Sequence, residues 1–194
     1  MTFTGARDRA PKAERAQLLA LAVAVLLLRG GERVGLAGTD APPRSGRAQL
    51  MRLAEALAED TAQDYGRPDT SGFVGHGRAV FLSDFLGDPS GVESALQTAA
   101  DRGVRGALVQ VLDPAEEEFP FDGRTIFESM GGTVRHETLR AGDLRQRYLD
   151  RLAARKERLS MLARASGWHY LCHHTGEGAQ GALLWLYRAL EGGH

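Results

Sequence analysis

The chain has 194 residues, of which 43% are hydrophobic and 25% charged, and its formal net charge at pH 7 is −1. This composition is that of a folded domain and excludes a globally disordered chain, while the near-neutral charge gives no general attraction to nucleic acid or anionic membranes. The single cysteine, Cys172, excludes an intrachain disulfide and a multi-cysteine zinc cluster. We interpret it as a buried, unreactive thiol in a reducing, cytoplasmic setting.

The first predicted element is an apolar helix over residues 13–29, with Pro11 in its first turn and Gly30-Gly31 at its end. Its segment 18–28 (LLALAVAVLLL) is shorter than the roughly 20 apolar residues that cross a bilayer. Basic residues precede this segment, so a signal peptide is the alternative, but no cleavage site follows. We therefore predict a helix buried between its neighbours.

Next along the chain come a short predicted strand, residues 33–39, and a loop. An amphipathic helix over 47–64 follows, because its apolar residues are three and four apart. Residues 65–77 form a long glycine-rich connection. The stretch 78–88 (RAVFLSDFLGD) is a continuous apolar run around Ser83-Asp84, and it predicts a central strand buried on both faces. Asp84 would lie at its carboxyl end, where open α/β sheets bind ligands and metals.

The second half of the chain continues the alternation of helices and strands. Glutamates 116–118 indicate a solvated turn, and Asp143 is the predicted N-cap of a long helix. The predicted elements are a helix over 90–102, a strand over 106–113, a β-hairpin over 125–137, a helix over 143–166, a strand over 168–173 and a helix over 179–191. This order predicts an α/β fold with a mostly parallel sheet and helices on both faces.

Three carboxylates, Asp40, Asp84 and Asp113, recur at predicted strand ends. Such a set could hold a divalent cation, with Ser45 adding a hydroxyl oxygen, or the same residues could simply cap helices and turns. His173 and His174 are adjacent on a strand and point to opposite faces, so they do not chelate one ion.

Two further functions remain open from the residues alone. Asp84 and Asp113 with a metal could serve a hydrolase or phosphatase, although the phosphate-binding loop and the glycine-flanked serine of common enzymes are missing. The basic residues of the helix over 143–166 could bind RNA or an acidic protein, or they form a solvated face.

Five pieces of the sequence, in this order and spacing, resemble a known bacterial family, the domain-of-unknown-function 58 family, which is related to von Willebrand factor A domains. The resemblance runs from about Thr2 to Arg188. The pieces are 31–36 (GERVGL), 43–50 (PRSGRAQL), 82–86 (LSDFL), 111–116 (VLDPAE) and 143–148 (DLRQRY).

The resemblance implies a Rossmann-like domain that binds another protein and is not an enzyme. It implies a metal-ion-dependent adhesion site for Mg²⁺, in which Asp84 matches a late aspartate ligand and Ser45 loosely matches a hydroxyl ligand. It also implies a partner, an AAA-type ATPase of the MoxR kind, in chaperone-like assembly or maturation.

The chain departs from this family at its start. The adhesion-site motif Asp-x-Ser-x-Ser is missing, and residues 1–5 (MTFTG) resemble the segment just after it. We therefore expect residues 1–194 to form a single von Willebrand factor A-like domain that is incomplete at the N-terminus, with its first central strand missing and its metal site degraded. Either the start codon is misassigned or this is a truncated relative. In the second case another chain's strand fills the gap, as in a homodimer.

Overall fold

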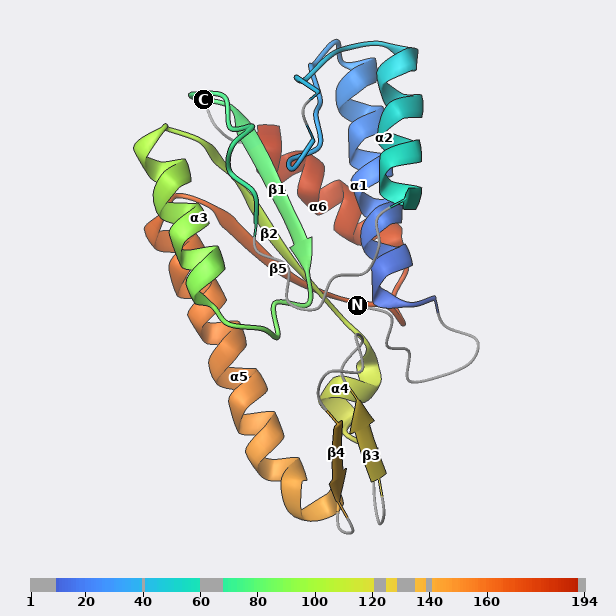
Figure 1. The fold of residues 1–194 in the computed structure, drawn as a ribbon, viewed down its shortest axis with the longest axis vertical. Coiled ribbons are helices and arrows are strands. Elements are labelled where there is room, and N and C mark those ends of the chain that lie inside the picture. Colours follow the sequence, from blue (N-terminus) through green and yellow to red (C-terminus); the bar gives the residue numbers. More distant parts are fainter. Residues whose placement is uncertain are drawn as a thin grey trace.

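The computed structural model describes residues 10–39, 41–59, 68–120, 125–128, 135–138 and 141–191, and within 125–128, 135–138 and 141–143 only the backbone. A three-stranded parallel sheet lies in the middle, with helices on both faces and a small two-stranded sheet apart from it (Figure 1). The elements are α1 (Lys12–Arg29), α2 (Arg47–Glu59), β1 (Arg78–Ser83), α3 (Ser90–Asp101), β2 (Arg105–Leu112), α4 (Pro114–Glu118), β3 (Thr125–Glu128), β4 (Arg135–Thr138), α5 (Ala141–Ala165), β5 (His169–His174) and α6 (Ala179–Glu191).

The sheet has the order β1-β2-β5, and both pairs of strands are parallel. β2 is the central strand, and every residue from Gly106 to Leu112 is buried, as its apolar sequence predicts. β1 differs from the prediction, because among the described residues it has one neighbouring strand, and its side chains are half-buried or exposed. The apolar run alone does not distinguish an edge strand covered by helices on both faces from a central one.

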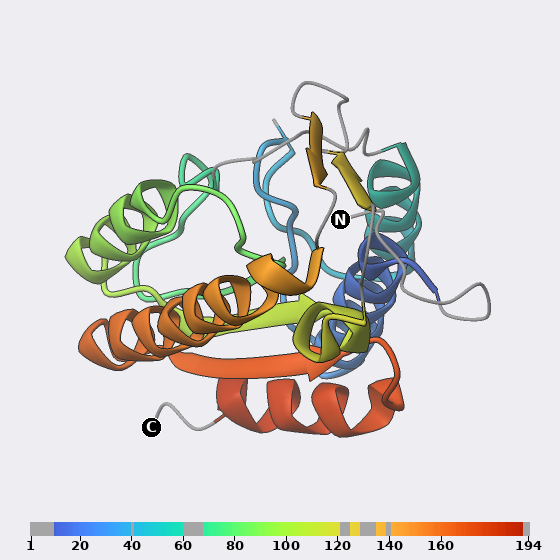
Figure 2. The same cartoon turned by 90° about the horizontal axis from the view of Figure 1, so that it is seen from below.

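Each face of the sheet packs against two helices. On one face, Leu108 of β2 lies in a cluster with buried residues of α3 and α5, including Leu96 and Leu159. On the other face, Val109 lies in a cluster with buried residues of α1 and α6, including Leu19. Figure 2 shows α5 and α6 on opposite sides of β5. The predicted α/β fold with helices on both faces of a parallel sheet is confirmed.

α1 lies against α2 and α6 as well as the sheet, and its buried stripe includes Leu19 and Val23. The prediction of a buried helix is therefore confirmed for this stripe. Within the described ranges, no helix is long and apolar enough to cross a membrane.

Several predicted elements need correction. The predicted strand over 33–39 is reduced to one bridge, between Val34 and Arg44, because two glycines and a turn follow within it. α5 begins at Ala141, so Asp143 lies inside the helix and not at its N-cap. The glutamates of 116–118 belong to α4 and do not form a solvated turn. The hairpin is confirmed as the antiparallel pair β3–β4, and its predicted Gly-Gly turn lies outside the described residues.

Gly106 is required for the close approach of β1 and β2. A Cβ atom at this position would overlap the backbone carbonyl oxygen of Ala79 on β1. We predict that Gly106→Ala lowers the free energy of unfolding by about 1–3 kcal/mol, measured as a shift of the urea midpoint.

The matched control is Gly181→Ala in α6, where a Cβ atom meets nothing within 4 Å. Alanine favours a helix interior over glycine by about 0.5–1 kcal/mol, so this variant should be more stable than the parent. Equal midpoints for the two variants would contradict the close approach.

Candidate functional site

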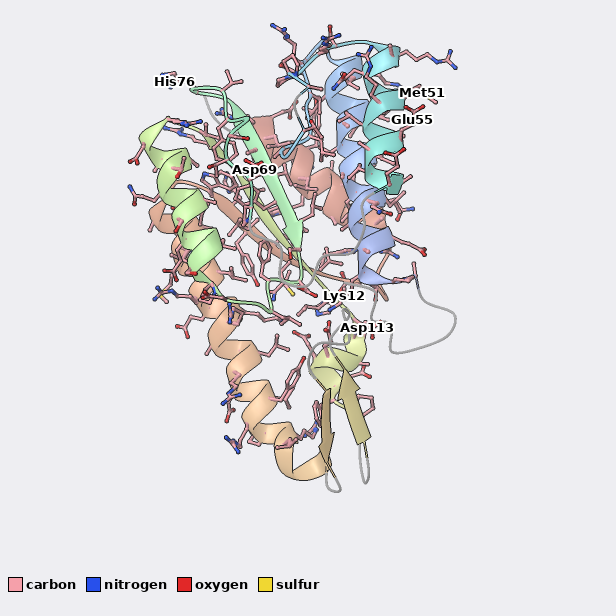
Figure 3. The ribbon with its side chains drawn as sticks, in the orientation of Figure 1. Lys12, Met51, Glu55, Asp69, His76 and Asp113 are labelled. Carbon is pink, nitrogen blue, oxygen red and sulfur yellow. The ribbon has the colours of Figure 1, made fainter. Side chains whose placement is uncertain are left out.

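A buried lysine lies at the carboxyl edge of the sheet. Lys12 is 2% exposed, and its ammonium nitrogen donates to Asp84 Oδ2 at 3.0 Å and to Glu116 Oε1 at 2.6 Å. Asp84 directly follows β1, and Glu116 belongs to α4, which follows β2. Figure 3 shows Lys12 close to Asp113 at this end of the sheet. One side chain therefore connects α1 with the ends of two strands.

The sequence of α1 brings Lys12 to this position. Lys12 is the first residue of the helix and shares its buried stripe with Ala16, Leu19 and Val23, at helical spacing. A cation at a helix N-terminus is opposed by the positive end of the helix dipole. The two carboxylates offset this repulsion and the cost of burying the charge.

Glu116 and Asp113 are held by a capping box at the start of α4. The Asp113 carboxylate accepts from the Ala115 N–H at 2.9 Å, and the Glu116 carboxylate accepts from the Asp113 N–H at 2.9 Å. Pro114 occupies the first helical position, where no N–H is needed. The Thr175 hydroxyl, just after β5, donates to the other Asp113 oxygen at 3.1 Å. Asp113 is fully buried, and hydrogen bonds to α4 and to Thr175 fix its carboxylate.

The turn after Asp84 is also fixed by hydrogen bonds. Phe85 has φ 50°, in the left-handed region that non-glycine residues rarely adopt. Its N–H donates to Ser83 Oγ at 3.2 Å, and Gln110 from the central strand donates to the Asp84 carbonyl at 2.8 Å. The Gln110 side-chain oxygen accepts from the Tyr170 hydroxyl at 2.6 Å, so the turn is joined across the sheet to β5.

Burial dominates the electrostatics of Glu116. It raises the pKa of this carboxyl, while the Lys12 ammonium and the hydrogen bond from the Asp113 N–H act in the opposite direction. Burial also raises the pKa of Tyr148, with the negative charges of Glu116 and Asp84 adding to the effect. Asp84 and Glu116 share the single ammonium of Lys12. Lys12 therefore favours the ionised form of Glu116 against the effect of burial.

The predicted metal residues are only partly brought together. Asp84 and Asp113 lie at the same edge, as predicted, whereas Asp40 is outside the described residues. Ser45 precedes α2, which runs antiparallel to α1, so it lies at the end of α1 opposite Lys12. Ser45 is exposed there.

The described residues do not form a ready oxygen cage for Mg²⁺. One oxygen each of Asp84 and Glu116 accepts from the Lys12 ammonium, and their other oxygens accept from backbone N–H groups. The Asp113 oxygens accept from the Ala115 N–H and from the Thr175 hydroxyl. Mg²⁺ binding therefore stays a prediction without an assembled ligand set in these ranges.

Lys12, Glu116 and Thr175 were not among the predicted site residues. Two sequence signals point to the first two. Lys12 falls on the helical stripe of Ala16 and Leu19, and Asp113 with Glu116 three residues later is the spacing of a capping box. The sequence holds no comparable signal for Thr175, whose role depends on the β2–β5 pairing.

His173, His174 and Cys172, for which the sequence made predictions, all lie on β5. His173 Nε2 lies 3.0 Å from an Arg15 nitrogen on the α1 side, whereas His174 Nε2 lies 2.9 Å from Glu117 on the α4 side. The Nε2 atoms therefore have partners on different elements, while both Nδ1 atoms face the Glu177 carboxylate at 3.5–3.6 Å.

Burial raises the pKa of the Cys172 thiol, partly offset by nearby Lys156. Cys172 is half-buried and not fully buried as predicted. A protonated thiol is unreactive, and it becomes a nucleophile or a metal ligand only when it loses its proton.

We predict that Lys12→Met lowers the free energy of unfolding at pH 7 by about 3–5 kcal/mol, because it leaves Asp84 and Glu116 without their buried cation. Without Lys12, the pKa of Glu116 rises further above its ordinary value of 4.5. Glu116 in the folded variant then binds a proton more tightly than in the unfolded chain. The loss in the free energy of unfolding, relative to the parent, should therefore shrink as the pH falls toward 4.5. Urea titrations at several pH values measure it.

The companion variant is Lys12→Met with Glu116→Gln, which removes the buried negative charge together with the cation. It should recover part of the lost stability at pH 7. A Lys12→Met deficit that is the same at pH 7 and pH 5, with no recovery in the double variant, would show that the ion pairs do not hold this edge together.

Comparison with known proteins places the chain in a family. Residues 1–158 match the model of the family described as Protein of unknown function DUF58. Neither the curated proteins nor the solved structures include a match to the chain. Since the match covers more than half of the 194 residues, the chain belongs to the DUF58 family.

Proposed function

We propose that the chain is a non-catalytic protein–protein interaction domain that works in the cytoplasm with a MoxR-type AAA ATPase, in chaperone-like assembly or maturation. The observation that carries the proposal is the open side of β1. In the part of the chain that the structure describes, β1 pairs with β2 alone. The von Willebrand factor A-like character of the fold and the identity of the ATPase belong to this proposal.

The backbone groups on the open side of β1 can be assigned. The Gly77 carbonyl accepts from the Arg105 N–H at 3.2 Å, and the Ala79 carbonyl lies against Gly106, so both point toward β2. Successive residues of a strand point their N–H and C=O groups to alternate sides. The backbone groups of Val80 and Leu82 therefore point away from β2.

Such an edge is suited to binding another strand. Unpaired N–H and C=O groups in a row are a template for strand addition, in which main-chain hydrogen bonds give affinity and side-chain pockets give specificity. The side chains of Val80 and Leu82 pack against the cluster between the sheet, α1 and α6, so the edge is held rigidly. A rigid strand loses little conformational entropy when a partner binds.

The experiment compares two substitutions at Val80 for binding of a MoxR-type ATPase, measured by calorimetry. Val80→Pro removes an N–H on the open side, where a proline is tolerated in an edge strand, and should weaken binding about tenfold or more. Val80→Ala loses similar packing but keeps the N–H, so it should bind like the parent. Circular dichroism confirms that both variants are folded.

Equal affinities for the parent, Val80→Ala and Val80→Pro would contradict binding at this edge. If the ATPase does not bind the parent chain at all, the proposed partner is wrong. A dimer that is seen by light scattering and lost only in Val80→Pro would instead identify the second strand as that of another copy.

We further propose that Mg²⁺ binding at the carboxyl edge is weak, because an ammonium group lies between the carboxylates that would serve as ligands. Calorimetry with Mg²⁺ on the parent chain should give a dissociation constant in the millimolar range or no measurable heat, as for a site without dedicated ligands. Micromolar binding that is lost in Asp84→Ala would contradict this.

The two other functions considered from the sequence stay predictions. Several polar groups of α5 have local partners, among them Arg158, which donates to Glu93 at 2.7 Å, and Lys156, which pairs with Glu117. A solvated, internally paired helix face therefore explains these residues without RNA. Asp84 pairs with Lys12, and Asp113 accepts from the Ala115 N–H and the Thr175 hydroxyl, which accounts for both carboxylates without a hydrolytic metal centre.

A further inference from the structure

Three metal-ligating side chains of different kinds meet beside the carboxyl end of β5. They are Glu117 of α4 with Cys172 and His174 of β5, and one donor atom from each lies within 4.8 Å of the others. Cys172 and His174 are two residues apart on a strand, so they share one face of the sheet. α4 follows the neighbouring strand β2 and brings Glu117 over that face.

The distances suit one small ion. His174 Nε2 lies 2.9 Å from Glu117 Oε2 and 4.0 Å from Cys172 Sγ. In a tetrahedral zinc site, bonds of about 2.0 Å to nitrogen and oxygen and about 2.3 Å to sulfur place ligand atoms roughly 3.3–3.7 Å apart. The two distances from His174 Nε2 lie close to this range, one slightly below it and one slightly above it, and the third pair, Cys172 with Glu117, lies within 4.8 Å. Side-chain rotations that bring Cys172 and Glu117 toward one ion complete the arrangement.

We propose that Glu117, Cys172 and His174 bind a Zn²⁺ ion. A thiolate and an imidazole select a borderline-soft ion such as zinc over Mg²⁺ or Ca²⁺, which prefer oxygen ligands. Three protein ligands leave the fourth position of the tetrahedron to a water molecule or to a group from a partner.

The groups around the three ligands support the proposal. The His174 Nδ1 atom faces the Glu177 carboxylate at 3.5 Å, which is the arrangement that orients metal-bound histidines and fixes Nε2 as the coordinating nitrogen. Lys156 pairs with Glu117 Oε1 and hydrogen-bonds the Cys172 thiol, so its partly exposed ammonium must turn toward solvent when the ion binds; the other Glu117 oxygen, Oε2, faces His174. The three ligands are half-buried, which leaves an entry path for the ion.

This site differs from the Lys12 site and from the open edge of β1. His173, between the two β5 ligands, points to the opposite face and lies near Arg15. Cys172 and His174 also lie beyond residues 1–158, which match the family. The zinc proposal therefore stands or falls independently of the proposed function.

The test is titration of the metal-free full chain with Zn²⁺ in the presence of a competing chelator of known affinity, under reducing conditions. We expect one ion per chain with a dissociation constant below about 1 μM, corresponding to at least 8.2 kcal/mol of binding free energy. Titration with Co²⁺ should give the intense near-ultraviolet band of a thiolate-to-cobalt bond, which reports Cys172 without any substitution.

Variants assign the ligands. Cys172→Ser and His174→Gln should each weaken zinc binding by at least about 100-fold, whereas Glu177→Gln, which removes only the orienting carboxylate, should weaken it by about tenfold. The matched control is His169→Gln, an exposed histidine at the start of the same strand, which should bind zinc like the parent.

Three results would overturn the proposal: no binding up to 100-fold above the expected dissociation constant, a cobalt spectrum without the thiolate band, or parent-like affinity in both Cys172→Ser and His174→Gln. If Cys172→Ser does not fold, Cys172→Ala and the cobalt band on the parent chain still decide the question.

Discussion

The carboxyl edge of the sheet depends on the buried ammonium of Lys12. This group is 2% exposed and contacts two carboxylates from different parts of the chain, Asp84 after β1 and Glu116 in α4. Burying a single cation would cost several kcal/mol, and burying the carboxylates without it would cost as much again. The three charges are therefore compatible with the fold only together, and this fixes the position of α1 relative to the strand ends.

This arrangement determines what the edge can do. In α/β sheets the carboxyl ends of the strands are the usual place for ligands and metals. Here the Asp84 carboxylate accepts from the Lys12 ammonium. The Asp113 carboxylate accepts from the Ala115 N–H and from the Thr175 hydroxyl. The side of β1 offers a different kind of site, because the backbone groups of Val80 and Leu82 point outward. The proposed recognition of a protein at that edge rests on these outward-pointing backbone groups.

Much of the fold could be predicted from the sequence, because hydrophobic periodicity reports elements directly. The run that forms β2 and the helical spacing of α6 gave nearly the observed bounds. The apolar run alone did not place β1 at the edge, since a helix-covered edge strand and a central strand are both apolar. The strand predicted around Val34 failed because a short run without a partner strand gains few hydrogen bonds.

The candidate site was less predictable, because its members depend on tertiary structure. Asp84 was found from its place at a strand end, but Ser45 was not brought to it, since helix direction decides which ends meet. The helical stripe of α1 indicates that Lys12 is buried, and the capping-box spacing indicates that Glu116 caps α4. Neither pattern shows that the two side chains contact each other. The group of Glu117 and Cys172 with His174 depends on the pairing of β2 with β5, which no local pattern shows.

The central claim is that the open side of β1 receives a strand from a partner, and amide hydrogen exchange tests it at single residues. In the isolated chain, the amides of Val80 and Leu82 should exchange quickly, while that of Phe81, which points toward β2, is protected. Adding the MoxR-type ATPase should slow exchange at Val80 and Leu82 and leave Phe81 unchanged. Unchanged rapid exchange at both residues in the saturated complex would contradict the claim.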